Sequence, residues 1–404
     1  MRFVIAANTA SQLIGKGIGA GVTFLVSLLL ASRFGVEGYG DFIKVITYVA
    51  FFFLIADFGL NAIYLQRQKD PNVFTTLFGT RIIGGFFLIF LSLAVLAFLP
   101  RGQSQGYTDI VRLGIILFSP AIFFQAMITT ANAIFQKHLR YDLATVALSV
   151  GSLVTLAFLF ILHQLPGNAP MIGSLVLLVG SVVTALVSLF FVKRLEATIS
   201  FSFSPARVIP FFAAAIPLGL TLLFNLVYGH ADSVILTLTR TTTEVGVYGL
   251  AYKVFELALV FPTFFMNAVY PMMLETDRFK TILKRSLVFL ILASCVMIPV
   301  VWFAAPYLSR IQDGFAASVP ALRVLSLSLP FFFVSALTMW ALIALKRHML
   351  LAGIYGGGMI LNISLNLFFI PVWGYMAAAW ITVVSEGLVL LVSGFFLYEA
   401  YRSY

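Results

Sequence analysis

Nine ionisable residues lie inside long apolar stretches of this sequence, and they are Lys16, Lys44, Asp57, Arg81, Asp232, Lys253, Glu256, Arg323 and Glu386. If these stretches cross a membrane, each charge costs about 2.5–3.5 kcal/mol at a helix centre. Water, a partner or a place near a helix end must relieve that cost. The cations could attract an anionic group, and the acids could carry a proton or a sodium ion. Lys44, Arg81 and Arg323 are close to predicted helix ends and could extend to water, and we expect this of Arg81 and Arg323.

Two of the apolar stretches also carry a polar stripe. The first stripe contains residues spaced four, four and seven apart, namely Asn8, Gln12, Lys16 and Thr23. The second contains Thr221, Asn225, Tyr228 and Asp232. Both spacings place the polar residues on one face of a helix. A polar face on a membrane helix points at a partner or at water, so we expect both stripes to face inward.

These residues together predict a hydrated central cavity that carries both signs of charge. The candidates for binding a substrate in it are Gln12, Lys16, Lys44, Asn225, Tyr252 and Lys253. The candidates for coupling to an ion are Asp57, Asp232, Glu256 and Glu386. Lys253 and Glu256 are one helical turn apart, so a simple ion pair between them is an equal alternative. Structural hydrogen bonding is the alternative for each acid.

The composition excludes a soluble globular protein. Of the 404 residues, 61% are apolar and 10% are charged, whereas soluble domains have about 45–50% and about 25%. One cysteine and four scattered histidines give no disulfide framework and no metal site. The sequence has no Gly-rich phosphate loop and no catalytic set that spacing supports. We therefore expect no enzyme and no cofactor, with a proton or sodium gradient as the energy source that the acids allow.

The apolar stretches are long enough for about twelve membrane helices of about 20 residues each. We predict spans at 9–32, 41–65, 78–99, 113–135, 143–163, 171–192, 210–239, 246–270, 286–305, 320–344, 350–370 and 375–398. With the N-terminus inside, the inner segments hold fifteen Lys and Arg residues and the outer loops hold five. This bias predicts a plasma (inner) membrane protein with both termini in the cytoplasm. It also accounts for the net charge of +10 without a nucleic acid partner.

The sequence repeats weakly at an offset of about 209 residues. Tyr39-Gly40-x-x-x-Lys44-Val45 matches Tyr248-Gly249-x-x-x-Lys253-Val254, and Gln136-Lys137-His138 matches Lys346-Arg347-His348. The repeat predicts an all-α polytopic membrane protein of twelve transmembrane helices, in two six-helix lobes related by a parallel pseudo-two-fold axis. The lobes would be 1–192 and 210–404, joined by a cytoplasmic linker at 193–209. Such paired bundles are typical of transporters that work by alternating access.

Several segments resemble bacterial polysaccharide and O-antigen flippases of the multidrug/oligosaccharidyl-lipid/polysaccharide exporter superfamily. They are Ser32 to Gly40, Asp57-Phe58-Gly59-Leu60, Val245 to Tyr248, Phe315 to Ser326, Asn362 to Asn366, Ile370-Pro371, Gly374 and Ser385-Glu386. The resemblance implies a flippase that moves a polyprenyl-pyrophosphate-linked oligosaccharide from the cytoplasmic to the outer leaflet. It also implies a basic residue in the first span, where this chain has Lys16. A glycan polymerase and glycosyltransferases are the protein partners to be expected.

Two other functions fit parts of the pattern. A multidrug and toxin extrusion antiporter would share the fold and the embedded acids. A membrane-embedded glycan polymerase or ligase would need a long outer loop, and the predicted outer loops reach only about a dozen residues. Normal surface glycan with raised drug sensitivity after deletion would indicate the antiporter. Glycosyltransferase genes beside this one would indicate the flippase.

Overall fold

The computed structural model describes residues 2–67, 69–70, 72–102, 104–162, 164–195, 203–274 and 279–402, without the side chains of 2–10, 271 and 401. Within these ranges the chain is helical and has no strand. The α-helices are α1 (Arg2–Asp57), α2 (Leu60–Gln66), α3 (Val73–Phe98), α4 (Asp109–Phe118), α5 (Ala121–Lys137), α6 (Tyr141–Leu162), α7 (Ala169–Leu195), α8 (Pro205–Thr239), α9 (Thr242–Met273), α10 (Phe279–Ala304), α11 (Ser318–Ser326), α12 (Leu329–Ala344) and α13 (His348–Arg402). Two 3₁₀ turns, η2 (Ala305–Arg310) and η3 (Asp313–Ala317), precede α11.

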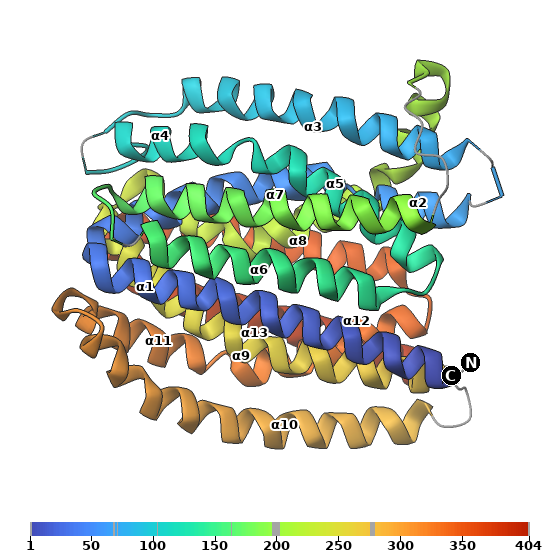
Figure 1. The fold of residues 1–404 in the computed structure, drawn as a ribbon. Helices are drawn as coiled ribbons and strands as arrows, with labels where there is room; N and C mark the ends of the chain where they lie inside the picture. The colour runs from blue at the N-terminus through green and yellow to red at the C-terminus, as the bar shows by residue number, and fades with distance from the viewer. Residues whose placement is uncertain are drawn as a thin grey trace. The chain divides into compact units, whose positions relative to one another are not determined.

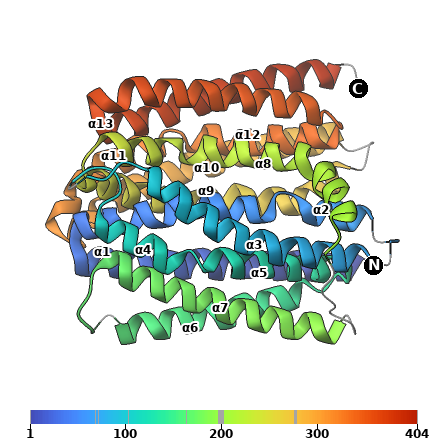
Figure 2. The same cartoon turned by 90° about the horizontal axis from the view of Figure 1, so that it is seen from above.

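The chain divides into two compact units. Unit 1 contains Met1–Leu30 and Asp41–Leu226, and unit 2 contains Ala31–Gly40 and Val227–Tyr404. In unit 1, α7 packs against α4, α5 and α6, and α3 packs against α5 (Figures 1 and 2). In unit 2, α12 packs against α9, α10 and α13. Only the tip of α1, residues 31–40, belongs to the second unit, while the chain on both sides of it belongs to the first.

Nine helices of the described residues are long and apolar enough to cross a membrane, or ten if the bent pair Asp313–Ser326 and Leu329–Ala344 forms one span. Their outer faces carry large apolar side chains such as Phe90, Phe98 and Phe303, which are 71%, 90% and 77% exposed. A soluble monomer rarely exposes so much apolar surface. These faces are suited to lipid.

Two of these helices are each interrupted by a glycine. α1 has 56 residues and α13 has 55, so each would reach about 80 Å if straight, against a hydrocarbon core of about 30 Å. Gly35 breaks α1 at φ 69° and ψ −171°, and Gly374 breaks α13 at φ 64° and ψ −149°. Glycine adopts this backbone conformation without the steric cost that a Cβ brings. Figure 1 shows α1 turning back on itself.

An ion pair fills the gap that the break opens in α13. In an unbroken helix the Tyr375 N–H would donate to the Pro371 carbonyl. Instead, Tyr375 N–H donates to Glu244 Oε2 over 3.2 Å, and Arg240 Nη1 donates to the Pro371 carbonyl over 3.2 Å. Arg240 and Glu244 are themselves paired at 2.8 Å. Both backbone groups that the break exposes are therefore satisfied, and a Cβ at Gly374 would overlap the Glu244 carboxylate.

Two predicted spans are interrupted rather than continuous helices. The span predicted at 113–135 consists of α4 and α5, which are separated at Ser119 and Pro120. The span predicted at 320–344 consists of α11 and α12, which meet at 45°. In each case a proline lies at or near the start of the second helix, and its missing N–H cannot continue the hydrogen-bond ladder.

Candidate functional site

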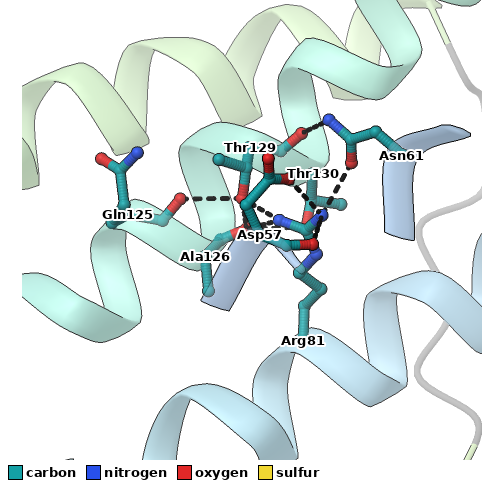
Figure 3. A network of polar contacts seen from close by, with 7 residues as sticks. All are labelled: Asp57, Asn61, Arg81, Gln125, Ala126, Thr129 and Thr130. Atoms are coloured by element: carbon teal, nitrogen blue, oxygen red, sulfur yellow. Dashed lines mark hydrogen bonds and ion pairs between the residues drawn. The ribbon is translucent and has the colours of Figure 1, made fainter. Parts of the chain in front are cut away.

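Unit 1 contains a buried network around Arg81 of α3. One guanidinium nitrogen, Nη2, donates to Asp57 Oδ1 at 3.1 Å and to Asn61 Oδ1 at 2.7 Å. The other, Nη1, donates to the hydroxyl of Thr129 on α5. Asn61 in turn donates to the Thr129 carbonyl over 3.0 Å. Figure 3 shows that these side chains converge from three segments of unit 1.

The network lies at the junction between α1 and α2, where the helical backbone is interrupted. Phe58 and Gly59 have φ values of 39° and 70°, so α1 ends at Asp57 and α2 begins at Leu60. Arg81 also donates to the Asp57 backbone carbonyl over 3.3 Å. Since a helix end leaves carbonyls without intrahelical partners, the arginine both stabilises the break and neutralises the acid beside it. We interpret this network as structural.

The expectation that Arg81 extends to water is wrong. Arg81 is 2% exposed. Because α3 begins at Val73, before the predicted start at 78, Arg81 lies about two turns inside the helix. Partners on other helices hold the guanidinium inside the protein. Asp57 supplies the opposite charge, and Asn61 and Thr129 supply acceptors. The sequence signal for this pairing is the acid that stands directly before a Phe-Gly break.

Unit 2 holds its buried acids differently. Asp232 of α8 accepts hydrogen bonds from the Tyr248 hydroxyl and from the Ser233 N–H. Tyr252 lies beside Tyr248, with ring centroids 5.6 Å apart, and donates to the Gly229 carbonyl over 2.9 Å. Asp232 is 5% exposed. Its carboxylate is therefore satisfied by neutral donors on α8 and α9.

Glu386 of α13 follows the same pattern. The Tyr228 hydroxyl donates to Glu386 Oε2 over 2.8 Å, and Glu386 is 2% exposed. Tyr252 lies within electrostatic range of both Asp232 and Glu386. In the part of the chain that the structure describes, no Lys, Arg or His forms an ion pair with either acid. Unit 2 thus brings two of the predicted coupling acids into one tyrosine-rich cluster, which consists of Tyr228, Asp232, Tyr248, Tyr252 and Glu386.

Other predicted site residues form local ion pairs. Lys253 Nζ lies 3.0 Å from Glu256 Oε2, so the pair that their spacing allowed does form. Lys44 Nζ lies 3.6 Å from Asp41 Oδ1, with the Lys44 side chain 0% exposed. A fully buried lysine against an acid one turn away is placed to stabilise its own helix. Its role in binding a substrate stays a prediction.

The two polar stripes are only partly exposed, and Asp232 at the end of the second one is buried. Lys16 and Asn225 are exposed and Gln12 is half-buried, whereas the hydroxyls of Thr23 and Thr221 donate to carbonyls four residues earlier in their own helices. The Asn8 side chain and residues 196–202 of the predicted linker lie outside the described part of the chain. Lys16 is thus an exposed cation on an apolar helix of unit 1.

The tip of α1 makes a close backbone contact with the start of α9. A Cβ at Gly40 would overlap the Thr242 carbonyl, and a Cβ at Gly246 would overlap the Val36 carbonyl. Tyr39 packs edge-on against Phe315, with ring centroids 6.0 Å apart. Only glycine allows two backbones to come so near. The segments that carry the resemblance at 32–40 and 245–248 therefore contact each other.

The sequence matches one family model. Residues 5–277, well over half of the chain, match the family described as "Polysaccharide biosynthesis protein". The chain belongs to this family. No curated protein has a sequence that matches the chain.

Solved structures show which fold the family member adopts. The lipid II flippase MurJ in an inward closed conformation is similar over 95% of this chain and 87% of its own, with a TM-score of 0.79 at 15% identity. A multidrug resistance MATE family transporter of the MOP superfamily is similar in its inward-facing conformation, with a TM-score of 0.74 at 13% identity, over 96% of this chain and 98% of that chain. An outward-facing multidrug resistance transporter has a TM-score of 0.71 at 13% identity, and the match covers 99% of this chain and 97% of that chain.

These likenesses establish the fold of a multi-pass membrane protein. The three neighbours are named as a flippase or as transporters and none as an enzyme, and they are solved in more than one conformation. Sequence reasoning found the acids of the unit 2 cluster but missed Tyr355, which lies within electrostatic range of Glu386. The signal that could have found it is its position on α13 about two turns before the Asn362 motif.

Proposed function

We propose that the protein is a flippase that translocates a polyprenyl-pyrophosphate-linked oligosaccharide from the cytoplasmic to the outer leaflet of the plasma membrane by alternating access. The observation that carries this proposal is an exposed cation, Lys16, on an apolar helix of a polysaccharide biosynthesis family member. A pyrophosphate diester is anionic, and a lysine that water reaches can bind it without first breaking an ion pair. The oligosaccharide is polar and needs the same hydrated surface, while the lipid tail stays in the bilayer.

The membrane topology that we propose has twelve crossings in two lobes of six, with both termini in the cytoplasm. The lobes would be 1–192 and 210–404, with the linker at 193–209. The support comes from the two glycine breaks, since α1 and α13 are each long enough for two crossings. α4 with α5, and α11 with α12, then count as one bent crossing each.

Alternating access finds support in the tip of α1. Residues 31–40 pack with unit 2 although the chain on both sides of them belongs to unit 1. In an alternating-access cycle, a tip that moves with the rest of α1 would have to release the glycine contact between Gly40 and Gly246. Such a contact is suited to a gate, because the two backbones pack directly against each other and can separate without rearranging long side chains.

The coupling ion would act on the tyrosine-rich cluster of unit 2. Asp232 and Glu386 are buried and hydrogen-bonded to neutral hydroxyls, so a proton or a sodium ion could bind without displacing an arginine or a lysine. Asp57 and Glu256 are already paired with cations and are the weaker candidates for coupling.

A multidrug and toxin extrusion antiporter is the second candidate function. It is favoured by the structural likeness to multidrug transporters. Such a protein would export cationic compounds, and its loss would leave the surface glycan unchanged. A glycan polymerase and glycosyltransferases are the partners that only the flippase would need.

Depletion of the protein in its native cell tests the proposal. Lipid-linked oligosaccharides would be extracted from cells with and without the protein, and their leaflet would be determined with a membrane-impermeant sugar-modifying enzyme. The flippase predicts accumulation on the inner leaflet and loss of surface glycan. Unchanged lipid-linked sugars together with raised sensitivity to cationic drugs would replace the flippase by the antiporter.

A further inference from the structure

A groove of about 820 Å³ runs between α10, α12 and the second limb of α13. Its walls are mainly leucine and phenylalanine side chains, among them Leu283, Leu287, Leu337, Leu390 and Phe395. Lys280 and Lys284 also line it, and both lie in the first turns of α10, which begins at Phe279. All of these residues belong to unit 2. The groove is therefore apolar along its length and basic at the end where α10 begins.

A second groove shows that this basic end is not a general property of the surface. It has about 370 Å³ and is lined by α13 alone, with Leu365, Phe369, Trp373 and Trp380 among its residues and no charged one. The first groove is larger and carries two lysines at the spacing i, i+4, which places their side chains on one face of the helix, with Cβ atoms about 5–6 Å apart. Arg285 lines an adjoining depression together with the same two lysines.

The sequence around the start of α10 keeps an excess of positive charge. Residues 275–285 contain four basic and two acidic residues, for a net charge of +2, and 275–278 lie outside the described part of the chain. Lys280, Lys284 and Arg285 are exposed. The bias of Lys and Arg among the loops predicts that this end faces the cytoplasm, where anionic lipids attract basic segments next to membrane helices.

We propose that this groove is a binding site for an anionic phospholipid of the inner leaflet, with phosphate on Lys280 and Lys284 and an acyl chain along the apolar walls. Basic pockets between membrane helices bind phosphate-bearing headgroups in this way. Two lysines fit a lipid with two phosphates, of the cardiolipin type, better than a lipid with one. The bound chain would fill the space between α10 and its neighbours α12 and α13, and it would stabilise unit 2. The site does not depend on what the protein transports.

Lipid binding to the purified full-length chain tests the site. The protein would be freed of native lipid in a neutral detergent and titrated with cardiolipin, phosphatidylglycerol and phosphatidylcholine, with retained lipid counted by native mass spectrometry. We expect one saturable site that binds cardiolipin at least tenfold more tightly than phosphatidylcholine, with phosphatidylglycerol between them. We also expect cardiolipin to raise the melting temperature.

Paired variants locate the site. The double variant Lys280→Gln/Lys284→Gln should lose at least tenfold in cardiolipin affinity, while its melting temperature without lipid stays that of the wild type. Lys193→Gln is the matched control, because Lys193 is an exposed lysine at the end of α7 that does not line the groove. Leu391→Trp, which fills the groove, should weaken binding of all three lipids. Equal retention of the three lipids by the wild type, or unchanged cardiolipin affinity in the double variant, would overturn the proposal.

Discussion

The two units of this protein hold the acidic groups of their apolar helices in opposite ways. In unit 1, Asp57 is held by Arg81, a fully buried cation that also stabilises a helix break. In unit 2, Asp232 and Glu386 accept hydrogen bonds from Tyr248 and Tyr228, with no ion pair among the described residues. The first arrangement is a neutral ion pair, with a buried arginine and an aspartate side chain that is 35% exposed. The second leaves two carboxylates whose charge state is free to change.

This difference affects how easily each unit can rearrange around its acidic groups. Breaking a buried ion pair leaves an uncompensated charge, which costs about 3–5 kcal/mol, so the Asp57–Arg81 pair is unsuited to frequent rearrangement. A tyrosine hydroxyl can donate to a carboxylate and can also rotate to accept from a carboxylic acid. Protonation or ion binding in unit 2 therefore disturbs less of the structure.

The largest expected effect is that of Arg81→Ala. The substitution leaves Asp57 and Asn61 without their donor. Because the Asp57 side chain is 35% exposed and can be hydrated, the free energy of unfolding should fall by about 3 kcal/mol, the cost of the lost charge-assisted hydrogen bonds. Thermal unfolding of the purified protein would measure it. Arg310→Ala is the control, because Arg310 is exposed and stacks on Tyr307, an interaction of about 0.5–1 kcal/mol. If both variants unfolded alike, the network in unit 1 would have no special structural role.

Gly374→Ala should give the next largest decrease in the free energy of unfolding. A non-glycine residue in this conformation costs about 1–3 kcal/mol, and the added Cβ would also push the Glu244 carboxylate away from the Tyr375 N–H. Gly353→Ala in the same helix is the matched control, since a Cβ at that position would meet no neighbouring atom within 4 Å, and it should be neutral or stabilising by up to about 1 kcal/mol. Equal melting temperatures would show that the break in α13 does not require glycine.

Glu386→Gln in unit 2 and Asp57→Asn in unit 1 together compare how the two units tolerate the loss of a carboxylate charge. The amide oxygen can still accept from Tyr228, and removal of a buried charge relieves its desolvation, so the free energy of unfolding should change by at most about 1 kcal/mol. The same change in unit 1, Asp57→Asn, should destabilise the protein more, because Arg81 would stay buried without its counter-charge. Glu386→Gln should also abolish any pH dependence of glycan export. A retained pH profile would give Glu386 a structural role only.

Lys16→Ala should leave the free energy of unfolding unchanged within about 0.5 kcal/mol, because the side chain is exposed. Glycan export should nevertheless fall by at least tenfold if Lys16 binds the pyrophosphate. Lys16→Arg keeps the charge and should retain part of the export. Surface glycan measured at matched expression is the readout. Normal export by Lys16→Ala would remove this residue from the site.

The sequence by itself determined the membrane class, the positions of most helices and the identity of the embedded charges. These follow from composition, from apolar length and from breaker residues, all of which act locally along the chain. Even the Lys253–Glu256 pair could be anticipated, because its geometry is that of one helical turn. The motifs at 32–40 and 245–248 could be recognised from the sequence, but their contact with each other could not.

Only the tertiary structure decided which partner each embedded charge takes. Distance to a helix end predicted that Arg81 would reach water, but Asp57 and Thr129 approach it from other helices, and that approach is a property of packing. The same holds for Tyr228 and Glu386, which are 158 residues apart in the chain, and for the Arg240–Glu244 pair at the break in α13. Helix periodicity fixes which face a side chain occupies, whereas the neighbour on that face depends on how the helices are assembled.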